Sequence, residues 1–353
     1  MPADIDRQAV LGPPYRTALK PYGRALAELA RARPEVVCLS GDLTRQCEVD
    51  LFADEFPERF IHAGMAEANM IGVAGALARQ GLMPFVHSFG VFTTRRPLDQ
   101  IVNAVAYPRL PVRIVGFMPG VSSPGGPSHQ AIDDVALMRA IPGMTVIDVA
   151  DATQTAQVVA AMADVPGPVY LRLKRGEIPV LFPGDHRLSL DRAQVLQWRG
   201  EATGGTAPSS DVTLLVSGMM VAPALAAARV LRAAGAVTVV VNVPVIKPLD
   251  TQTVLAVAAA SQAVITAENH SVIGGLGSAV AEALAEAGLG RPLRRIGLQD
   301  TFAEGARDAA YLFTKYGLTT QRLVDTAWAV LDRPGAAPRA PTLPADVGEY
   351  APV

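Results

Sequence analysis

The amino-acid sequence predicts an α/β protein with two doubly wound parallel-sheet domains. Short β-branched runs alternate along the chain with longer stretches of helical periodicity. Strand, crossover helix and strand in succession give parallel strands with helices on both faces of a sheet. Half of the residues are hydrophobic and only 5 % are aromatic, which suits small-residue helices packed on a buried parallel sheet. A length of 353 residues corresponds to two domains, since one domain takes about 100 to 200 residues.

The predicted strands form two series with an irregular polar segment between them. The first series is 36–39, 83–86, 112–116, 145–149 and 169–173. The second series is 212–217, 237–243, 263–267 and 293–297. The expected organisation is an N-terminal extension (1–14), a first domain (15–183), a linker (184–210), a second domain (211–332) and a flexible Pro/Ala-rich tail (333–353).

Charge and cysteine content narrow the class of protein. The 31 Lys plus Arg residues nearly balance the 33 Asp plus Glu residues, so a net charge of -2 gives no general attraction to nucleic acid or to an anionic membrane. Cys38 and Cys47 are too few for a disulfide framework and lack a C-x-x-C spacing, so we expect buried free thiols. No signal peptide is visible, and the longest apolar run, 251–267, is shorter than the ~20 residues of a spanning helix. We therefore expect a cytoplasmic protein with a small-molecule substrate.

The most informative segment is 63–78, in which Glu67 is the only ionisable residue. At helical spacing, Glu67 shares a face with Met70, Ile71, Ala74 and Ala78. A carboxylate on such a face is costly unless it is paired or protonated. It is either a first-turn residue favoured by the helix dipole or a functional group. Gly72 and Gly75 would let another helix approach closely, as at a subunit interface.

Many ordered blocks of the sequence resemble the transketolase family, and most closely the C-terminal subunits of its two-gene, split members. The resemblance runs from about residue 15 to residue 331. Its blocks are 40–44 (SGDLT), 56–60 (FPERF), 64–70 (GMAEANM), 84–92 (PFVHSFGVF), 126–130 (GPSHQ), 246–250 (IKPLD), 267–271 (AENHS) and 274–277 (GGLG). It implies a pyrimidine-binding domain in the first half and a transketolase C-terminal domain in the second.

The resemblance implies thiamine diphosphate as the cofactor. In this family a glutamate, here Glu67, binds N1′ of the aminopyrimidine and promotes the tautomer that generates the thiazolium ylide. Phe89 and Phe92 match the aromatic wall against the pyrimidine ring, although two phenylalanines at this spacing also suit a core. Asp42 and Leu43 match residues near the thiazolium, with a turn or N-cap role as the alternative for Asp42.

The loop 122–130 leads into a predicted helix and carries His129. Ser128 is a plausible N-cap, with Asp133 and Asp134 in the first turns. His129 would then lie at the positive helix end, which favours the neutral imidazole. The resemblance implies that His129 contacts the donor's oxygens, in substrate binding or proton transfer; the alternative is a loop-to-backbone hydrogen bond.

The chain lacks the family's Gly-Asp-Gly motif and later Asn, which hold the diphosphate and Mg²⁺. The segment Gly41-Asp42-Leu43 with Asn69 is a poor match, because Leu43 replaces the second glycine. No metal ligands are expected here, so an N-terminal partner subunit would supply them, in an α2β2 heterotetramer. There is no P-loop or dinucleotide fingerprint. The glycine loop 274–277 before a predicted helix over 278–287 is either an anion cradle or a plain strand-to-helix turn.

Several positions depart from ordinary transketolase. Gly125 replaces an aspartate that reads a donor hydroxyl, and Met118 and Gln46 replace residues that hold the donor phosphate. A further phosphate-binding arginine is matched only loosely, by Lys20. The predicted substrate contacts are His87, Arg95, His129 and Arg175. Of these, Arg175 matches the family's phosphate-binding arginine, Arg95 replaces a tyrosine, and His87 replaces a small residue. An atypical donor is therefore expected.

The function predicted from the resemblance is transfer of a two-carbon unit from a ketose or 2-oxo donor to an aldehyde. This makes the chain a transferase of aldehyde or ketone residues, active only with its partner. One alternative is the beta subunit of the first component of a 2-oxo-acid dehydrogenase, which shares these two domains. Another is a non-catalytic regulatory subunit; the presence of Glu67, Phe89, Phe92 and His129 argues against it.

Overall fold

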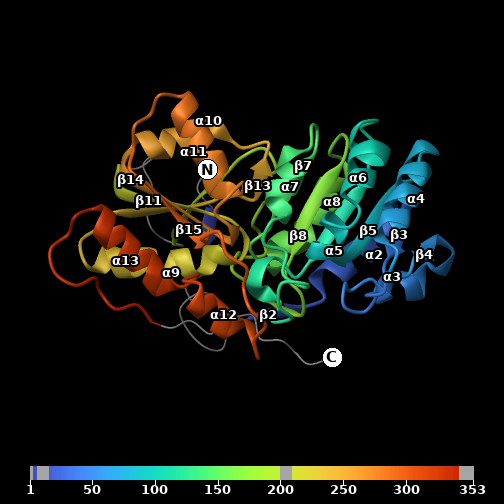
Figure 1. Cartoon of the computed structure of the whole chain (residues 1–353), viewed down its shortest axis with the longest axis horizontal. Coiled ribbons are helices and arrows are strands. Elements are labelled where there is room, and N and C mark those ends of the chain that lie inside the picture. Colours follow the sequence, from blue (N-terminus) through green and yellow to red (C-terminus); the bar gives the residue numbers. More distant parts are fainter. Residues whose placement is uncertain (1–2, 6–15, 199–208, 342–353) are drawn as a thin grey trace.

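The computed structural model describes residues 3–5, 16–198 and 209–341. The chain forms two α/β halves that lie next to each other along the long axis (Figure 1). The first half supplies most of the seven-stranded sheet, and the second half supplies most of the six-stranded sheet. The strands that cross between them are described below. The predicted fold class, two mainly parallel-sheet domains, is confirmed.

The first sheet has the strand order β13-β7-β8-β6-β5-β3-β4. In that order its strands are β13 (Val245–Lys247), β7 (Thr145–Asp148), β8 (Val169–Leu173), β6 (Arg113–Phe117), β5 (Met83–Phe89), β3 (Val36–Ser40) and β4 (Phe60–His62). All neighbours are parallel except β13, which runs antiparallel to β7. Strand β13 comes from the second half of the chain, so the two halves share this sheet edge.

Helices cover both faces of the first sheet. One face packs against α2 (Pro21–Ala32), α3 (Asp50–Glu55) and α8 (Ala152–Ala163). The other packs against α4 (Glu67–Arg79), the π-helix Ile101–Ala106 and α7 (Asp134–Ala140). The short helices α5 (Gly90–Thr94) and α6 (Leu98–Gln100) connect β5 to the π-helix. Every residue of β3, β5, β6 and β8 is buried, as expected for a central parallel sheet covered on both sides.

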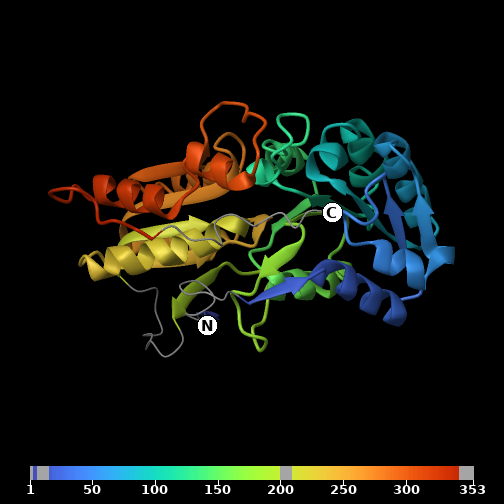
Figure 2. The same cartoon turned by 90° about the horizontal axis from the view of Figure 1, so that it is seen from below.

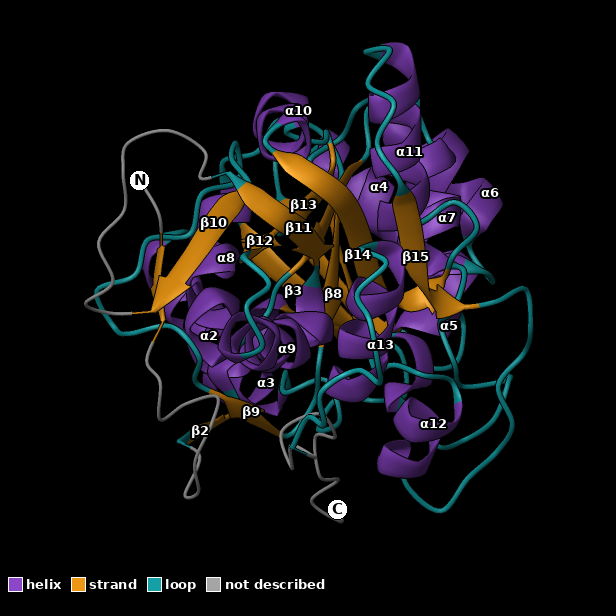
Figure 3. Cartoon of the chain, turned by 90° about the vertical axis from the view of Figure 1, so that its left-hand side faces the viewer, coloured by secondary structure: helices purple, strands orange, loops and turns teal. Residues whose placement is uncertain are grey.

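The second sheet has the order β1-β10-β12-β11-β14-β15. Its strands are β1 (Ala3–Ile5), β10 (Gln194–Trp198), β12 (Thr238–Asn242), β11 (Ser210–Val216), β14 (Ser261–Ser271) and β15 (Leu293–Leu298). On one face lie α10 (Thr251–Ala259) and α11 (Leu276–Glu286), and on the other α9 (Val221–Ala233), α12 (Ala309–Lys315) and α13 (Thr320–Val330), as Figure 3 shows.

Part of the segment expected to be a linker is regular structure. Strand β10 pairs antiparallel with β12 and parallel with β1, so both the linker and the N-terminal extension contribute to the second sheet. Residues 199–208 of the expected linker lie outside the described residues. A small ribbon joins β2 (Thr17–Leu19) to β9 (Glu177–Pro179). The described start of the tail lies against α13, where Gln321 bonds the backbone of Pro338 and Ala340.

The two halves are joined by a continuous apolar core. One cluster of buried side chains runs from α4 and α7 in the first half to α10 and α11 in the second. Figure 2 shows the two halves in contact along this boundary. Burying apolar surface stabilises a fold by about 25 cal/mol per Å². Moving the halves apart would expose this cluster to water and is therefore costly. The second domain is therefore a fixed part of the surroundings of any site in the first.

A buried ionic network crosses the same boundary. Arg172, at 1 % exposure, bonds Asp134 (2.7 Å), Asp148 (3.1 Å) and the backbone oxygen of Asn269 (3.1 Å). Burial alone would raise the pKa of Asp134, but Arg172 holds it below its usual range. Burial raises the pKa of Asp148, which also accepts a bond from Ser217 of the second half.

The glycine loop 274–277 is a strand-to-helix turn that serves the fold. Both oxygens of the buried Glu268 accept the first free N–H groups of α11, from Leu276 (2.7 Å) and Gly277 (2.8 Å). A Cβ on Gly275 would overlap the same carboxylate. The anion cradle is thus filled by the chain's own Glu268. Both cysteines are buried and free, as predicted. Within the described residues, no helix has the length and apolar character needed to cross a bilayer.

Candidate functional site

Most of the predicted site residues lie at the carboxyl ends of the parallel strands of the first sheet, with His87 an exception described below. Gly41, after β3, donates a backbone hydrogen bond to His87 (3.1 Å), and Ala63, after β4, donates one to Ser40 (2.8 Å). These bonds hold the turn carrying Asp42 and Leu43 beside the segment that enters α4. Ligands of parallel sheets bind at this end.

Asp42 and Leu43 occupy opposite sides of their turn. The Asp42 side chain is 61 % exposed, with its Oδ1 3.8 Å from Nε2 of His62. Leu43 packs partly buried against the core formed with α2 and α8. Asp42 is thus open to a ligand, while Leu43 offers an apolar edge.

Glu67 begins α4, and the predicted face is confirmed. Met70, Ile71, Ala74 and Ala78 are buried with it, and Glu67 is only 5 % exposed. The close approach predicted at Gly75 is made within the chain, because a Cβ there would lie 2.6 Å from the Ala104 oxygen of the π-helix. Gly72 faces open space.

The carboxylate of Glu67 is paired with Arg96, a residue that sequence reasoning missed. Arg96 Nη1 lies 2.7 Å from Glu67 Oε1, and the guanidinium carbon lies 4.0 Å from the centre of the Phe92 ring. The Phe89 and Phe92 rings are 6.0 Å apart and within 18° of parallel. A carboxylate on an apolar face predicts a cationic partner for Glu67. The sequence does not indicate which residue supplies the cation, because Arg95 and Arg96 are adjacent and chemically identical.

The contacts of Arg96 show whether these residues fit an aminopyrimidine. A flat group bearing N–H donors already contacts the two residues that would hold such a ring: its central carbon lies over the Phe92 ring, and an N–H bonds Glu67. Arg96 is half exposed, so it can move into water when a ligand takes its place. The side chains therefore fit a planar nitrogen heterocycle.

His129 lies edge-on to the same aromatic pair. Its ring centre is 5.3 Å from that of Phe92 and 6.5 Å from that of Phe89. Ser128 Oγ lies 2.9 Å from His129 Nδ1. In the tautomer with its proton on Nδ1, His129 donates to the Ser128 oxygen, and the lone pair of Nε2 is left to accept a proton from a substrate.

The expected helix around Ser128 is wrong. Residues 127–129 form a turn, and α7 begins only at Asp134 with Asp133 as its N-cap. Ala131 is held in a parallel bridge with Pro119, which keeps the segment extended. His129 therefore lies away from a helix terminus, and the helix dipole gives no reason for its protonation state.

Arg95 belongs to the loop that carries His129. Its guanidinium pairs with Asp133 (2.8 Å) and donates to the backbone oxygens of Pro127 (3.3 Å) and Gln130 (3.4 Å). These contacts occupy Arg95 in shaping the loop. The substrate contact expected of Arg95 has no support in the geometry.

His87 is the expected substrate residue that the structure places elsewhere. It is fully buried, with Nε2 2.6 Å from the Tyr22 hydroxyl and Nδ1 3.0 Å from the Leu39 oxygen. Burial lowers the pKa of His87 to about 4. Because β5 is buried on both faces, its sequence gave no sign of which face His87 would take. His87 is a core residue beneath the site.

Arg175 and Gly125 border the site. Arg175 follows β8, and its charge acts on the nearby buried thiol of Cys47, opposing the burial that raises the pKa of that thiol. A Cβ on Gly125 would lie 2.9 Å from Cβ of His129 and 3.0 Å from its Cγ. The glycine thus permits the observed position of His129. Lys20, by contrast, is paired with Asp50.

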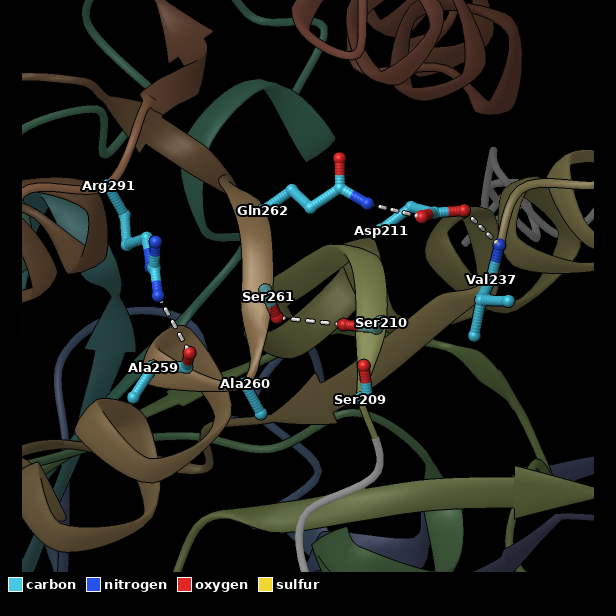
Figure 4. Close-up of a pocket in the computed structure, with 9 residues that line it drawn as sticks. All are labelled: Ser209, Ser210, Asp211, Val237, Ala259, Ala260, Ser261, Gln262 and Arg291. Carbon is cyan, nitrogen blue, oxygen red and sulfur yellow. Dashed lines mark hydrogen bonds between the residues drawn. The ribbon is translucent and has the colours of Figure 1, made fainter.

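A separate cavity of about 270 Å³ lies at the opposite, amino-terminal end of the second sheet (Figure 4). Its polar groups bond one another: Ser210 with Ser261 (2.8 Å), Gln262 with Asp211 (2.6 Å) and Arg291 with the Ala259 oxygen (3.0 Å). Nothing there resembles a reactive constellation. Among the residues the structure describes, no three His, Cys, Asp or Glu side chains are grouped to hold a metal ion.

Comparison with known proteins agrees with the two-domain fold. The transketolase pyrimidine-binding domain matches residues 15–180, and the transketolase C-terminal domain matches residues 205–323. A subunit of 6-deoxy-6-sulfo-D-fructose transketolase from Clostridium sp. (strain MSTE9) is 42 % identical, over 88 % of this chain and 94 % of that protein. One of the subunits of apulose-4-phosphate transketolase from Phocaeicola vulgatus is 32 % identical, over 87 % of this chain and 95 % of that protein.

The solved structures give the same result. A split-gene transketolase, described as an inactive β4 tetramer, has a TM-score of 0.79 and 41 % identity, covering 89 % of this chain and 97 % of that one. The sequence resemblance, the two domains and the relatives agree along nearly the whole chain. The chain therefore belongs to the transketolase family and carries its pyrimidine-binding and C-terminal domains, as the split C-terminal subunits do.

Proposed function

We propose that this chain is the C-terminal subunit of a two-component, thiamine-diphosphate-dependent transketolase-like enzyme. The observation that carries the proposal is the planar guanidinium of Arg96, which lies over the Phe92 ring and bonds Glu67. It occupies the place that the aminopyrimidine of the cofactor would take. When bound, thiamine diphosphate supplies the carbon nucleophile that attacks the donor carbonyl.

In this proposal each residue has one task at the site. Glu67 holds a proton at N1′ of the aminopyrimidine, and its burial keeps water from that bond. Phe89 and Phe92 support the ring by stacking. Asp42 and Leu43 lie at the edge where the thiazolium would lie.

His129 binds the donor and moves a proton. The bond between C2 and C3 of a ketose donor breaks, and the C3 hydroxyl loses its proton as the leaving fragment becomes an aldehyde. A nitrogen of His129 accepts that proton. It returns a proton to the carbonyl oxygen of the acceptor aldehyde when the new carbon–carbon bond forms.

The partner is an N-terminal subunit that holds the diphosphate and Mg²⁺, in an α2β2 heterotetramer. Exposed apolar side chains that such a partner could cover lie just before α4 and on or just after the π-helix. Met65 is 78 % exposed, Tyr107 87 % and Val102 37 %. The relative solved as an inactive β4 tetramer supports the view that such a chain needs a different partner for activity.

The donor is proposed to differ from an ordinary sugar phosphate. Gly125 has no side chain that could bond a donor hydroxyl. Met118 and Gln46 carry no charge with which to bind a phosphate. Arg175 remains as a cation for the far end of the substrate. The relative named for 6-deoxy-6-sulfo-D-fructose supports a modified donor, because a sulfonate carries one negative charge where a phosphate carries nearly two.

The test is to co-express and co-purify the chain with candidate transketolase N-terminal subunits from the same organism, add thiamine diphosphate and Mg²⁺, and screen donors with aldehyde acceptors. Xylulose 5-phosphate, 6-deoxy-6-sulfofructose, apulose 4-phosphate, unphosphorylated ketoses and pyruvate form the panel. Transfer from a modified or unphosphorylated ketose supports the proposal. Turnover of xylulose 5-phosphate at ordinary transketolase rates overturns the atypical donor. Oxidation of pyruvate with an artificial electron acceptor favours the dehydrogenase alternative, and inactivity on every donor with cofactor bound favours a regulatory subunit.

A further inference from the structure

The loop that carries His129 begins in contact with the second domain. Asn269, at the end of β14, is 2 % exposed and meets this loop with both ends of its amide group. Its Nδ2 donates to the Pro119 oxygen (2.9 Å), and its Oδ1 accepts from the Val121 nitrogen (2.9 Å). A side chain that replaces water at both atoms fixes the start of the loop.

The same loop meets the second domain again just before His129. Gly125 forms an antiparallel bridge with Gly305, and Ala306 donates to the Pro124 oxygen (2.9 Å). Gly126, at φ +76°, faces Gly305, and a Cβ there would lie 3.5 Å from it, in ordinary van der Waals contact. Two segments far apart in the sequence thus behave here as a short pair of strands.

The side chain of Gln130 links the loop that carries His129 to the second-domain segment around Gly305. It is 1 % exposed and follows His129 in the chain. Its Nε2 donates to the Ser123 oxygen (3.0 Å) in the loop and to the Glu304 oxygen (3.0 Å) in the second domain. Both amide protons are therefore used, one for each side of the junction.

The second-domain side of the junction is itself anchored to α12. The Glu304 carboxylate accepts from Tyr311 (2.8 Å) and pairs with Lys315 (2.6 Å). The Glu304 nitrogen donates to the Tyr316 hydroxyl (3.0 Å). Three side chains on or just after α12 thus hold one residue of the loop that holds Gln130.

We propose that the second domain positions His129: Gln130 is the positioning residue, and Glu304 anchors its partner loop to α12. The role given to His129 rests on the proposed function, but the clamp itself does not. Loops that carry functional residues move unless the scaffold holds them, and an error of about 1 Å in a catalytic group can cost ~10²-fold in rate. The second domain is accordingly part of the catalytic apparatus without touching the substrate.

The experiment compares Glu304→Ala with Glu55→Ala in the complex with the N-terminal subunit. The two glutamates are matched: the Glu304 side chain is 44 % exposed and the Glu55 side chain 36 %, and each makes one ion pair of 2.6 Å. Hydrogen exchange by mass spectrometry reports on residues 119–131. Steady-state kinetics on the best donor of the screen report kcat and KM separately, and cofactor binding is measured alongside.

For Glu304→Ala we expect faster exchange in residues 119–131, a fall in kcat of about 10-fold or more, a smaller change in KM and unchanged cofactor affinity. Glu304→Gln, which keeps acceptors for Tyr311 and Lys315, should recover most of the rate. Glu55→Ala should match the wild type. Unchanged exchange in 119–131, or faster exchange with unaltered kcat, overturns the inference. If the wild-type complex is inactive, the proposed function fails, and exchange alone decides whether the clamp exists.

Discussion

The guanidinium of Arg96 lies 2.7 Å from the carboxylate of Glu67 and 4.0 Å from the centre of the Phe92 ring. One side chain thus bonds the Glu67 carboxylate and lies over the Phe92 ring, the two groups proposed to hold the cofactor ring. An ion pair with a half-exposed partner is worth about 0–1 kcal/mol, so a ligand can displace it. Under the proposed function, Arg96 therefore competes with the cofactor for Glu67 and Phe92.

Removing this competitor should strengthen cofactor binding. For Arg96→Ala in the complex, we expect the dissociation constant for thiamine diphosphate to fall by up to about fivefold, since the lost ion pair no longer has to be broken. Isothermal titration of the complex with thiamine diphosphate and Mg²⁺ measures it. Arg79→Ala, at the exposed far end of α4, is the control. Weaker binding by Arg96→Ala would mean that Arg96 helps to hold the cofactor instead.

A pH dependence of stability is expected from Glu48. This carboxyl group is 2 % exposed, accepts the N–H groups of Tyr22 and Gly23 (both 3.1 Å), and burial raises its pKa to about 7. The folded state therefore binds the Glu48 proton more tightly than the unfolded state. Its contribution to the free energy of unfolding is fully present below pH 4.5 and is lost as pH rises through 7, by on the order of 3 kcal/mol.

The measurement is urea unfolding of wild type and Glu48→Gln between about pH 5 and 8. His87 acts with the opposite sign, because its pKa is lowered to about 4 and its contribution is lost as pH falls below 6.5. Only the difference between the two proteins isolates Glu48. We expect the advantage of the wild type over Glu48→Gln to shrink as pH rises. Glu58→Gln, with a side chain 69 % exposed, should show no such trend, and an advantage that grows with pH would refute the assignment.

The ionic network between the domains should be sensitive to loss of its cation. Arg172→Met leaves the buried Asp134 and Asp148 without their shared guanidinium, which costs about 3–5 kcal/mol in the free energy of unfolding. Thermal and urea unfolding measure the loss. Arg31→Met, which breaks the exposed pair with Glu55, is the matched control and should change stability little. A variant at 172 as stable as the control would show that the network contributes nothing.

Much of the fold follows from local patterns in the sequence. The buried face of α4 was predictable because helical periodicity depends only on the spacing of apolar residues. Strand β4 is three residues long and gave no alternation to detect. Strand β13 pairs with β7 across the domain boundary. Strand β1, which precedes the first domain in the sequence, pairs with β10, which follows that domain. Pairings of that kind depend on tertiary packing, which a local pattern does not encode.

The grouping of the candidate residues was predictable where a residue's place follows from its own position in the sequence. Glu67, Phe89, Phe92 and His129 do lie together. Prediction failed where the outcome depended on side-chain direction, as for His87, which points into the core. It failed also for the helix expected at Ser128, because the bridge between Ala131 and Pro119 outweighs a local capping signal.

The central claim is that Glu67 acts on a cofactor bound in this chain's site. The most direct test is the rate of two-carbon transfer by the complex carrying Glu67→Gln, with cofactor saturation verified separately. Because Gln has no proton to exchange with N1′, we predict a fall in kcat of about 10²- to 10⁴-fold, while Glu58→Gln keeps the wild-type rate. A Glu67→Gln complex that binds the cofactor and turns over at the wild-type rate would contradict the account.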